Sequence, residues 1–131
     1  MSSGFKFSQR SLDRLQGVHP KLVEVMTLAL EKSQVDFVVT EGTRSLSRQK
    51  MLYDEGKSQT MNSRHLPQKD GLSHAVDVAA MVNGAVSWEW GLYEKINSAV
   101  QAAADQLGAK ITWGGTWKTL RDGPHFQIGG V

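Results

Sequence analysis

The chain has 131 residues, of which 40% are hydrophobic, and its four Trp and four Phe add enough apolar material for the core of one domain. Charged residues make up 21% of the chain with both signs interspersed, which excludes an intrinsically disordered class. The formal net charge of +2 is too small to indicate nucleic-acid binding.

The chain contains no cysteine, so any metal site must be built from His, Asp and Glu. Its first residues, Met1 to Phe7, include no apolar run of the length of a secretory signal or a membrane span. We therefore expect a protein that is synthesised in the cytoplasm and does not insert stably into a membrane.

Two helices are predicted at the start of the chain. Ser8 or Ser11 can cap a short helix that ends near Gly17, and Pro20 suits the first turn of a second helix that runs to about Lys32. Apolar residues recur in the second helix at spacings of three and four, which predicts one buried face. These residues are Leu22, Val23, Met26, Ala29 and Leu30.

A strand and a third helix follow. Residues 35–40 are β-branched and aromatic, which predicts a strand. Residues 45–55 predict a helix that stops at Gly56, because glycine readily takes the left-handed conformation at a helix end. The polar run 56–71 then predicts a loop.

The second half of the chain predicts a hairpin, a long helix and two short strands. Residues 74–81 and 85–88 are expected to form strands joined by a turn at Asn83-Gly84. Apolar residues at helical spacing predict a helix over 90–107, and short strands are expected at 110–113 and 125–128. Helices grouped around a few short strands indicate an α+β fold with a small, mainly antiparallel sheet flanked by helices.

Few residues can bind a metal ion. The four histidines are His19, His65, His74 and His125. A catalytic zinc site usually takes three protein ligands and leaves a fourth position for water. Plausible ligands lie in three segments, 63–65, 74–77 and 122–125.

Strand geometry separates the two central histidines. Side chains alternate between the faces of a strand, so His74 and Asp77, an odd number of residues apart, should point to opposite sides. His65 arrives from the loop and can reach the face of Asp77. Asp77 lies among apolar residues, where a carboxylate is costly to bury unless it is paired or binds a cation.

Asp122 and His125 are joined by a Gly-Pro bend, so one can bind a metal ion while the other faces the bound water. A carboxylate in that place can accept a proton from a water whose pKa zinc has lowered to about 7. The alternative is a surface turn next to a core histidine.

Three motifs, in this order, resemble the zinc signature of the D-alanyl-D-alanine carboxypeptidase and phage L-alanyl-D-glutamate peptidase superfamily. They are Ser63-x-His65, Ala75-Val76-Asp77 and Asp122-Gly123-Pro124-His125-Phe126. Two further segments are similar to parts of that superfamily: Glu41-Gly42-Thr43-Arg44-Ser45 with Gln49, and Trp113-Gly114-Gly115-Thr116-Trp117. The resemblance spans roughly residues 35–128.

The resemblance implies a hedgehog/D-Ala-D-Ala-peptidase-like single domain over residues 1–131, with no separate cell-wall-binding domain. It implies that His65, Asp77 and His125 bind Zn2+ and that Asp122 is the general base. His65 and Asp77 are separated by eleven residues, more than in the compact form of the motif, and Ser73 stands in place of a glycine. We interpret the extra residues as a longer loop; if that loop folds otherwise, His74 is the substitute ligand.

Arg44 would, by the same resemblance, orient the substrate or stabilise the developing oxyanion, since its planar fork can hold a carboxylate or a tetrahedral oxygen. The alternative is a structural ion pair with Glu41. Ser63 would contact the substrate or only shape its loop, and the loop role is preferred. Trp113 and Trp117 either line the cleft or belong to the core.

The activity implied by the resemblance is hydrolysis of the L-alanyl-D-glutamate bond in the stem peptides of peptidoglycan, by an endolysin during phage-driven lysis. The expected form is a monomer made in the host cytoplasm that reaches the cell wall in the periplasm with the help of a holin. Two alternatives stay open. One is a D-alanyl-D-alanine carboxypeptidase or dipeptidase, and the other is a non-catalytic, zinc-containing cell-wall-binding module, against which Asp122 argues.

Overall fold

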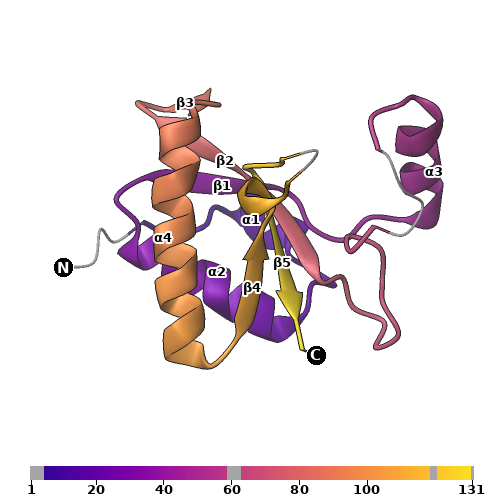
Figure 1. The fold of residues 1–131 in the computed structure, drawn as a ribbon, viewed down its shortest axis with the longest axis horizontal. Coiled ribbons are helices and arrows are strands. Elements are labelled where there is room, and N and C mark those ends of the chain that lie inside the picture. The colour runs from indigo at the N-terminus through magenta and orange to yellow at the C-terminus, as the bar shows by residue number, and fades with distance from the viewer. Residues whose placement is uncertain (1–4, 59–62, 119–120, 131) are drawn as a thin grey trace.

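The computed structural model describes residues 5–58, 63–118 and 121–130, and Figure 1 shows a small sheet flanked by helices. The helices are α1 (Gln9–Arg14), α2 (Pro20–Lys32), α3 (Leu46–Asp54) and α4 (Trp90–Leu107). The strands are β1 (Asp36–Glu41), β2 (Ala75–Val82), β3 (Ala85–Ser87), β4 (Lys110–Trp113) and β5 (His125–Gly129). A short 3-10 helix, η1 (Gly114–Thr116), follows β4.

The sheet has the strand order β1-β2-β5-β4, with β3 paired to β2, and all of these pairs are antiparallel. The α+β fold with a small antiparallel sheet, predicted from the sequence, is confirmed. Strand β2 lies between β1 and β5, so it receives neighbours from both halves of the chain.

The element boundaries follow the local signals. Ser8 caps α1 by accepting a hydrogen bond from the backbone N–H of Ser11, and Pro20 is the first residue of α2. The turn between β2 and β3 places Asn83 and Gly84 at positive φ, as the Asn-Gly pair predicts. The strand β2 starts one residue later than the predicted range.

The core lies between the sheet and the pair of helices α2 and α4, which pack against each other (Figure 1). The buried face of α2 consists of Leu22, Val25, Met26, Ala29 and Leu30, so Val25 replaces the predicted Val23, which is only partly buried. The buried face of α4 consists of Tyr93, Ile96, Val100, Ala103 and Ala104. Both faces follow the helical periodicity that the sequence shows.

Helix α3 lies to the side of the sheet in Figure 1. Its apolar residues Leu46 and Met51 are exposed, whereas the polar Gln49 is fully buried. The side chain of Gln49 accepts a hydrogen bond from Arg44 at 2.6 Å. This helix is therefore attached to the domain through polar contacts rather than through an apolar face.

In the described part of the chain, none of the helices combines the length and the apolar character that crossing a membrane would require.

Tyr93 joins α4 to the β2–β3 hairpin, and its removal tests this connection. Its hydroxyl donates to the carbonyl of Ser87 at 2.8 Å and accepts from the N–H of Ala80 at 3.0 Å. We expect Tyr93→Phe to lower the free energy of unfolding by about 1–3 kcal/mol, because a buried N–H and a partly buried carbonyl lose their partner. Urea denaturation measures this. Tyr53→Phe, on the exposed side of α3, is the control, and equal stability of the two variants would contradict the prediction.

Candidate metal centre

The register of the sheet brings together residues that are far apart in the sequence. Asp77 in β2 pairs with Glu41 at the end of β1 and with His125 at the start of β5. Residues opposite each other on antiparallel strands point to the same face, with Cβ atoms about 4.5–5.5 Å apart. The three side chains therefore lie side by side on one face, where β1 ends and β5 begins.

His65 reaches this face from the connection between α3 and β2. Its carbonyl accepts a hydrogen bond from the backbone N–H of Arg44 at 2.8 Å. Its ring atom Nδ1 lies 2.8 Å from the carbonyl oxygen of Gly42. Because a carbonyl oxygen only accepts, Nδ1 carries a hydrogen and donates it to Gly42, which leaves Nε2 to face Asp77.

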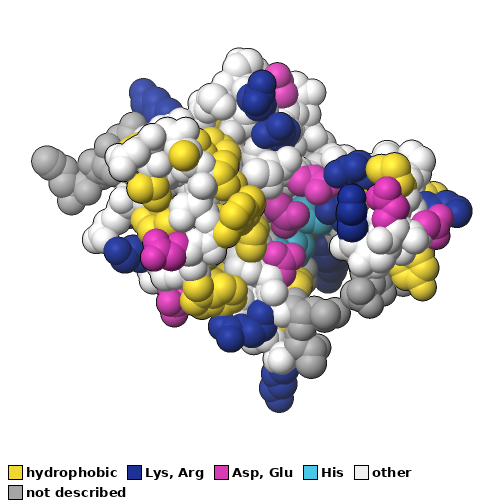
Figure 2. Space-filling view, turned by 90° about the horizontal axis from the view of Figure 1, so that it is seen from above, with side chains coloured by type: hydrophobic (Ala, Val, Ile, Leu, Met, Phe, Trp, Pro, Cys, Tyr) yellow, Lys and Arg dark blue, Asp and Glu magenta, His cyan; other side chains and the backbone are white. Residues whose placement is uncertain are grey.

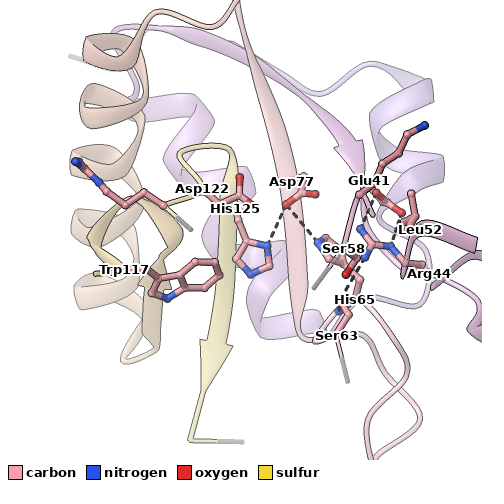
Figure 3. Close-up of a pocket in the computed structure, with 12 residues that line it drawn as sticks. Glu41, Arg44, Leu52, Ser58, Ser63, His65, Asp77, Trp117, Asp122 and His125 are labelled. Carbon is pink, nitrogen blue, oxygen red and sulfur yellow. Dashed lines mark hydrogen bonds and ion pairs between the residues drawn. The ribbon is translucent and has the colours of Figure 1, made fainter. Parts of the chain in front are cut away.

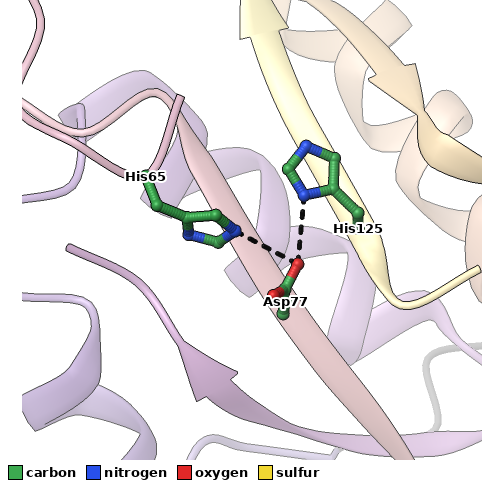
Figure 4. Close-up of side chains that lie close together, drawn as sticks. All are labelled: His65, Asp77 and His125. Atoms are coloured by element: carbon green, nitrogen blue, oxygen red, sulfur yellow. Dashed lines mark hydrogen bonds and ion pairs between the residues drawn. The ribbon is translucent and has the colours of Figure 1, made fainter. Parts of the chain in front are cut away.

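His125 is oriented in a similar way by a different acceptor. Its Nε2 lies 2.9 Å from Oε1 of Gln127, and its Nδ1 lies 3.1 Å from Oδ1 of Asp77. In each histidine, one nitrogen is thus fixed by an oxygen and the other is directed at Asp77 (Figure 4).

The side chains of His65, Asp77 and His125 form a group that can hold a metal ion. Their potential ligand atoms all lie within 4.8 Å of one another. His65 Nε2 is 3.3 Å from Asp77 Oδ1, yet it is buried and makes no hydrogen bond to any described residue. A lone pair facing a carboxylate oxygen is unfavourable unless a cation lies between them. The arrangement therefore fits a bound cation.

The charges of this group are strongly coupled. Burial raises the pKa of Asp77, but the hydrogen bond with His125 leads the effects that outweigh burial and hold the pKa of the carboxyl well below its usual range. Burial also disfavours the charged form of His125, but the hydrogen bond to Asp77 outweighs it and raises the pKa of the ring. Asp77 is therefore an anion at neutral pH and available as a ligand.

His74 lies away from this group, as the alternation of side chains along β2 predicts. Its Nε2 is 2.9 Å from Oδ2 of Asp70, and its ring packs against His19 with centroids 5.5 Å apart. The N–H of His74 donates to the carbonyl of Arg64 at 2.9 Å, which ties the end of the longer loop to the residue before His65. The extra residues thus protrude from the site without displacing His65.

Asp122 lines the same cleft, next to His125 in Figure 3. Burial, and then the negative charge of Asp77, raise the pKa of Asp122 above its usual value. Its position depends on Gly114, because a Cβ at Gly114 would collide with the carbonyl oxygen of Asp122. The glycine after β4 therefore allows this carboxylate to approach the site.

Arg44 is buried and largely occupied by the protein itself. Its Nε and Nη2 donate to the two carboxylate oxygens of Glu41 at 2.7 and 2.9 Å. Its Nη1 donates to Gln49 at 2.6 Å and to Ser63 at 3.4 Å. The alternative of an ion pair with Glu41 is thus present in the structure. Of the five N–H groups of a guanidinium, one has no partner in the described ranges.

Ser63 shapes the loop before His65. Its Oγ accepts from the backbone N–H of His65 at 3.1 Å, in addition to the contact with Arg44. Both Ser63 and Arg44 also line the cleft, so neither contact removes them from the site (Figure 3).

The cleft has a volume of about 600 Å³ and two distinct walls. In Figure 2 the histidines lie at the bottom of a hollow, with acidic side chains beside them. Arg44, Leu52, Lys57, Ser58 and Ser63 form the wall on the α3 side, and Trp117, Arg121 and Asp122 contribute from the segment before β5. Trp113 is instead buried and donates to the carbonyl of Gly123 at 2.6 Å, so of the two candidate tryptophans only Trp117 lines the cleft.

Some of these residues were not predicted. Gln127, the acceptor for His125, lies two residues further along β5, so the period of two along a strand could have identified it. Lys57, Ser58 and Arg121 carry no such signal, because they enter the cleft only through the folding of their segments.

Comparisons with known proteins agree with this geometry. The sequence pattern of the family described as phage L-alanyl-D-glutamate peptidase matches residues 3–127. The crystal structure of the Serratia marcescens L-Ala D-Glu endopeptidase ChiX superposes with a TM-score of 0.86 at 50% identity, covering 97% of this chain and 92% of that one.

Two further relatives are more distant. The L-alanyl-D-glutamate peptidase of Escherichia phage T5 is 29% identical over 122 residues, which cover 90% of this chain and 85% of the phage protein. The peptidoglycan L-alanyl-D-glutamate endopeptidase CwlK of Bacillus subtilis (strain 168) is 28% identical over 115 residues, covering 80% and 68%. Together with the fold, these matches show that the chain belongs to the phage L-alanyl-D-glutamate peptidase family.

Proposed function

We propose that this protein is a zinc-dependent endopeptidase that hydrolyses the L-alanyl-D-glutamate bond of peptidoglycan stem peptides. The observation that carries the proposal is the buried Nε2 of His65, which faces Oδ1 of Asp77 at 3.3 Å without a hydrogen bond. The choice of the L-alanyl-D-glutamate bond rests on membership of the family, because the named relatives are peptidases or endopeptidases for that linkage.

Zinc is the cation that suits this donor set. His65, Asp77 and His125 offer two imidazole nitrogens and one carboxylate, and zinc accepts both kinds of ligand, whereas calcium and magnesium prefer sites made of oxygens. These three residues would hold the ion, and a catalytic zinc site with three protein ligands would keep a further position for water. When bound there, zinc would supply a water of lowered pKa and polarise the scissile carbonyl.

Asp122 is proposed as the general base. It would accept the proton of the attacking water and pass it to the amine that leaves. Its raised pKa suits both tasks, since a base whose pKa lies closer to the working pH both takes up and returns a proton more readily. Burial beside the charge of Asp77 is the cause of that shift.

Arg44 is proposed to act on the substrate through a single hydrogen bond. Since Glu41 occupies its fork, Arg44 is not available as a bidentate clamp for a substrate carboxylate. The remaining N–H can donate to the scissile carbonyl oxygen and to the oxyanion that develops from it. Ser63, held between Arg44 and His65, can donate its hydroxyl hydrogen to the same peptide.

The biological setting is part of the proposal. We place the protein in phage-driven lysis, as a monomer that is made in the host cytoplasm and reaches the cell wall after release by a holin. The family resemblance supports this setting.

Digestion of purified peptidoglycan tests the proposed activity. The expected products, identified by mass spectrometry, are peptides with a new N-terminal D-glutamate and glycan that keeps L-alanine. Free D-alanine as the sole product would instead identify a carboxypeptidase, and intact stems in the presence of zinc-loaded protein would indicate a binding module.

Replacement of Asp122 separates catalysis from metal binding. We expect Asp122→Ala to keep the fold and one zinc ion per chain but to lower kcat by about 10²–10⁴-fold, because the positioned base is lost. Metal content and steady-state rates on the same preparation measure both effects. Full activity in the variant would show that another group takes the proton.

Replacement of Gln127 tests how His125 is oriented. Gln127→Leu removes the acceptor of the Nε2 hydrogen while keeping a side chain of similar size. We expect zinc affinity, measured by competition with a chromophoric chelator, to fall by about 10–100-fold. Gln106→Leu, on the exposed side of α4, is the matched control. Unchanged affinity in Gln127→Leu would mean that this hydrogen bond has no influence on the ligand.

A further inference from the structure

A patch of exposed hydrophobic side chains borders the cleft on the side opposite α3. Trp88 is 64% exposed and Trp90 is 37% exposed, and Val82 and Val86 are exposed beside them on the β2–β3 hairpin. Figure 2 shows hydrophobic side chains over β3 and the start of α4, next to the hollow that holds the histidines. Contiguous exposed apolar surface next to a cleft often marks a binding site.

One face of the Trp88 ring is held in place by Tyr93. The two rings stack with centroids 6.1 Å apart and an interplanar angle of 5°. Tyr93 is itself fixed by its hydrogen bonds to Ala80 and Ser87. One face of the indole is therefore supported, while the other is available to a ligand at little entropic cost.

Trp90 connects this patch to the cleft. A Cβ at Gly123, the residue after Asp122, would lie 3.1 Å from the ring of Trp90 and 3.5 Å from Cβ of Tyr93. The guanidinium of Arg121 lies over the ring of Trp90 at 4.4 Å and donates from Nε to the carbonyl of Gly115 at 3.1 Å. Arg121 lines the cleft as well, so the aromatic patch continues into it.

The chemical structure of peptidoglycan indicates which part of the substrate would lie against this patch. The cut bond follows the first residue of the stem, and that residue is attached directly to the N-acetylated sugar. A residue spans only about 3.5 Å, so the sugar must lie at the rim of the cleft when the bond is at the metal centre. The carboxylates of the stem lie beyond the cut bond and suit the opposite wall, which carries Lys57.

We propose that Trp88, Trp90 and Arg121 form a subsite for the glycan strand that carries the stem peptide; this inference rests on the proposed function. The C–H face of a pyranose ring is apolar and can stack on the open face of Trp88. The terminal nitrogens of Arg121 bind no described residue and can donate to sugar hydroxyl or acetamido oxygens. The subsite thus favours glycan-linked stems over free peptides.

Two substrates that differ only in the sugar test the proposal. One is the stem peptide on its N-acetylglucosaminyl-N-acetylmuramyl disaccharide, and the other is the same peptide with an N-terminal acetyl group. We expect the zinc-loaded wild-type protein to cleave the first with a higher kcat/KM. Trp88→Ala should lower kcat/KM about tenfold for the disaccharide substrate and leave the acetylated peptide unchanged. Trp88→Phe should retain most of the preference.

Tyr53→Ala, another exposed aromatic that lies on α3 outside the cleft, is the matched control and should alter neither rate. Equal loss on both substrates in Trp88→Ala, or no preference in the wild-type protein, would overturn the subsite. A wild-type dimer that dissociates in Trp88→Ala would assign the patch to a second copy of the chain and overturn it too.

If the wild-type protein cleaves neither substrate, the proposed function is wrong, and binding then decides on the subsite separately. Quenching of tryptophan fluorescence by the disaccharide substrate, reduced about tenfold in affinity by Trp88→Ala, would support the subsite. Absence of quenching would overturn it.

Discussion

The contact on which the site depends is the approach of two histidine nitrogens to one carboxylate oxygen. His65 Nε2 and His125 Nδ1 lie 3.3 and 3.1 Å from Oδ1 of Asp77. Nε2 of His65 is buried and has no hydrogen-bond partner among the described residues, which is unusual for a buried polar atom. The surrounding fold holds this geometry: the pairing of β2 with β5 sets Asp77 beside His125, and the carbonyl of Gly42 orients His65. The geometry of His65, Asp77 and His125 thus fits a bound cation at the centre of the group.

The two walls of the cleft differ in chemistry, so they favour one orientation of a substrate. On the α3 side, Arg44 is paired with Glu41 and also donates to Gln49 and to Ser63 in the loop of His65, and its proposed contribution to the substrate is one hydrogen bond. On the other side, Asp122 follows Arg121 in a segment that packs on aromatic rings. A substrate with a sugar at one end and carboxylates at the other matches this asymmetry.

Patterns within single segments of the sequence predicted the helices and the faces of the strands. Helical periodicity located α2 and α4, and the alternation of side chains along β2 correctly separated His74 from Asp77. The pairing of Asp77 with His125 could not be derived in this way, because strand register joins segments 48 residues apart. Helix α3 misleads a prediction based on hydrophobicity, since it buries Gln49 and exposes Leu46. The contacts that attach α3 to the domain are polar, and such contacts produce no periodic pattern of hydrophobic residues in the sequence.

The proposed metal site is tested by the position of a zinc ion in crystals of the protein, located by anomalous scattering at the zinc absorption edge. We expect one strong peak per chain within about 2.0–2.2 Å of His65 Nε2, His125 Nδ1 and an Asp77 oxygen. A peak elsewhere, such as beside His74 and Asp70, or the absence of a peak in protein that hydrolyses stem peptides, would contradict it.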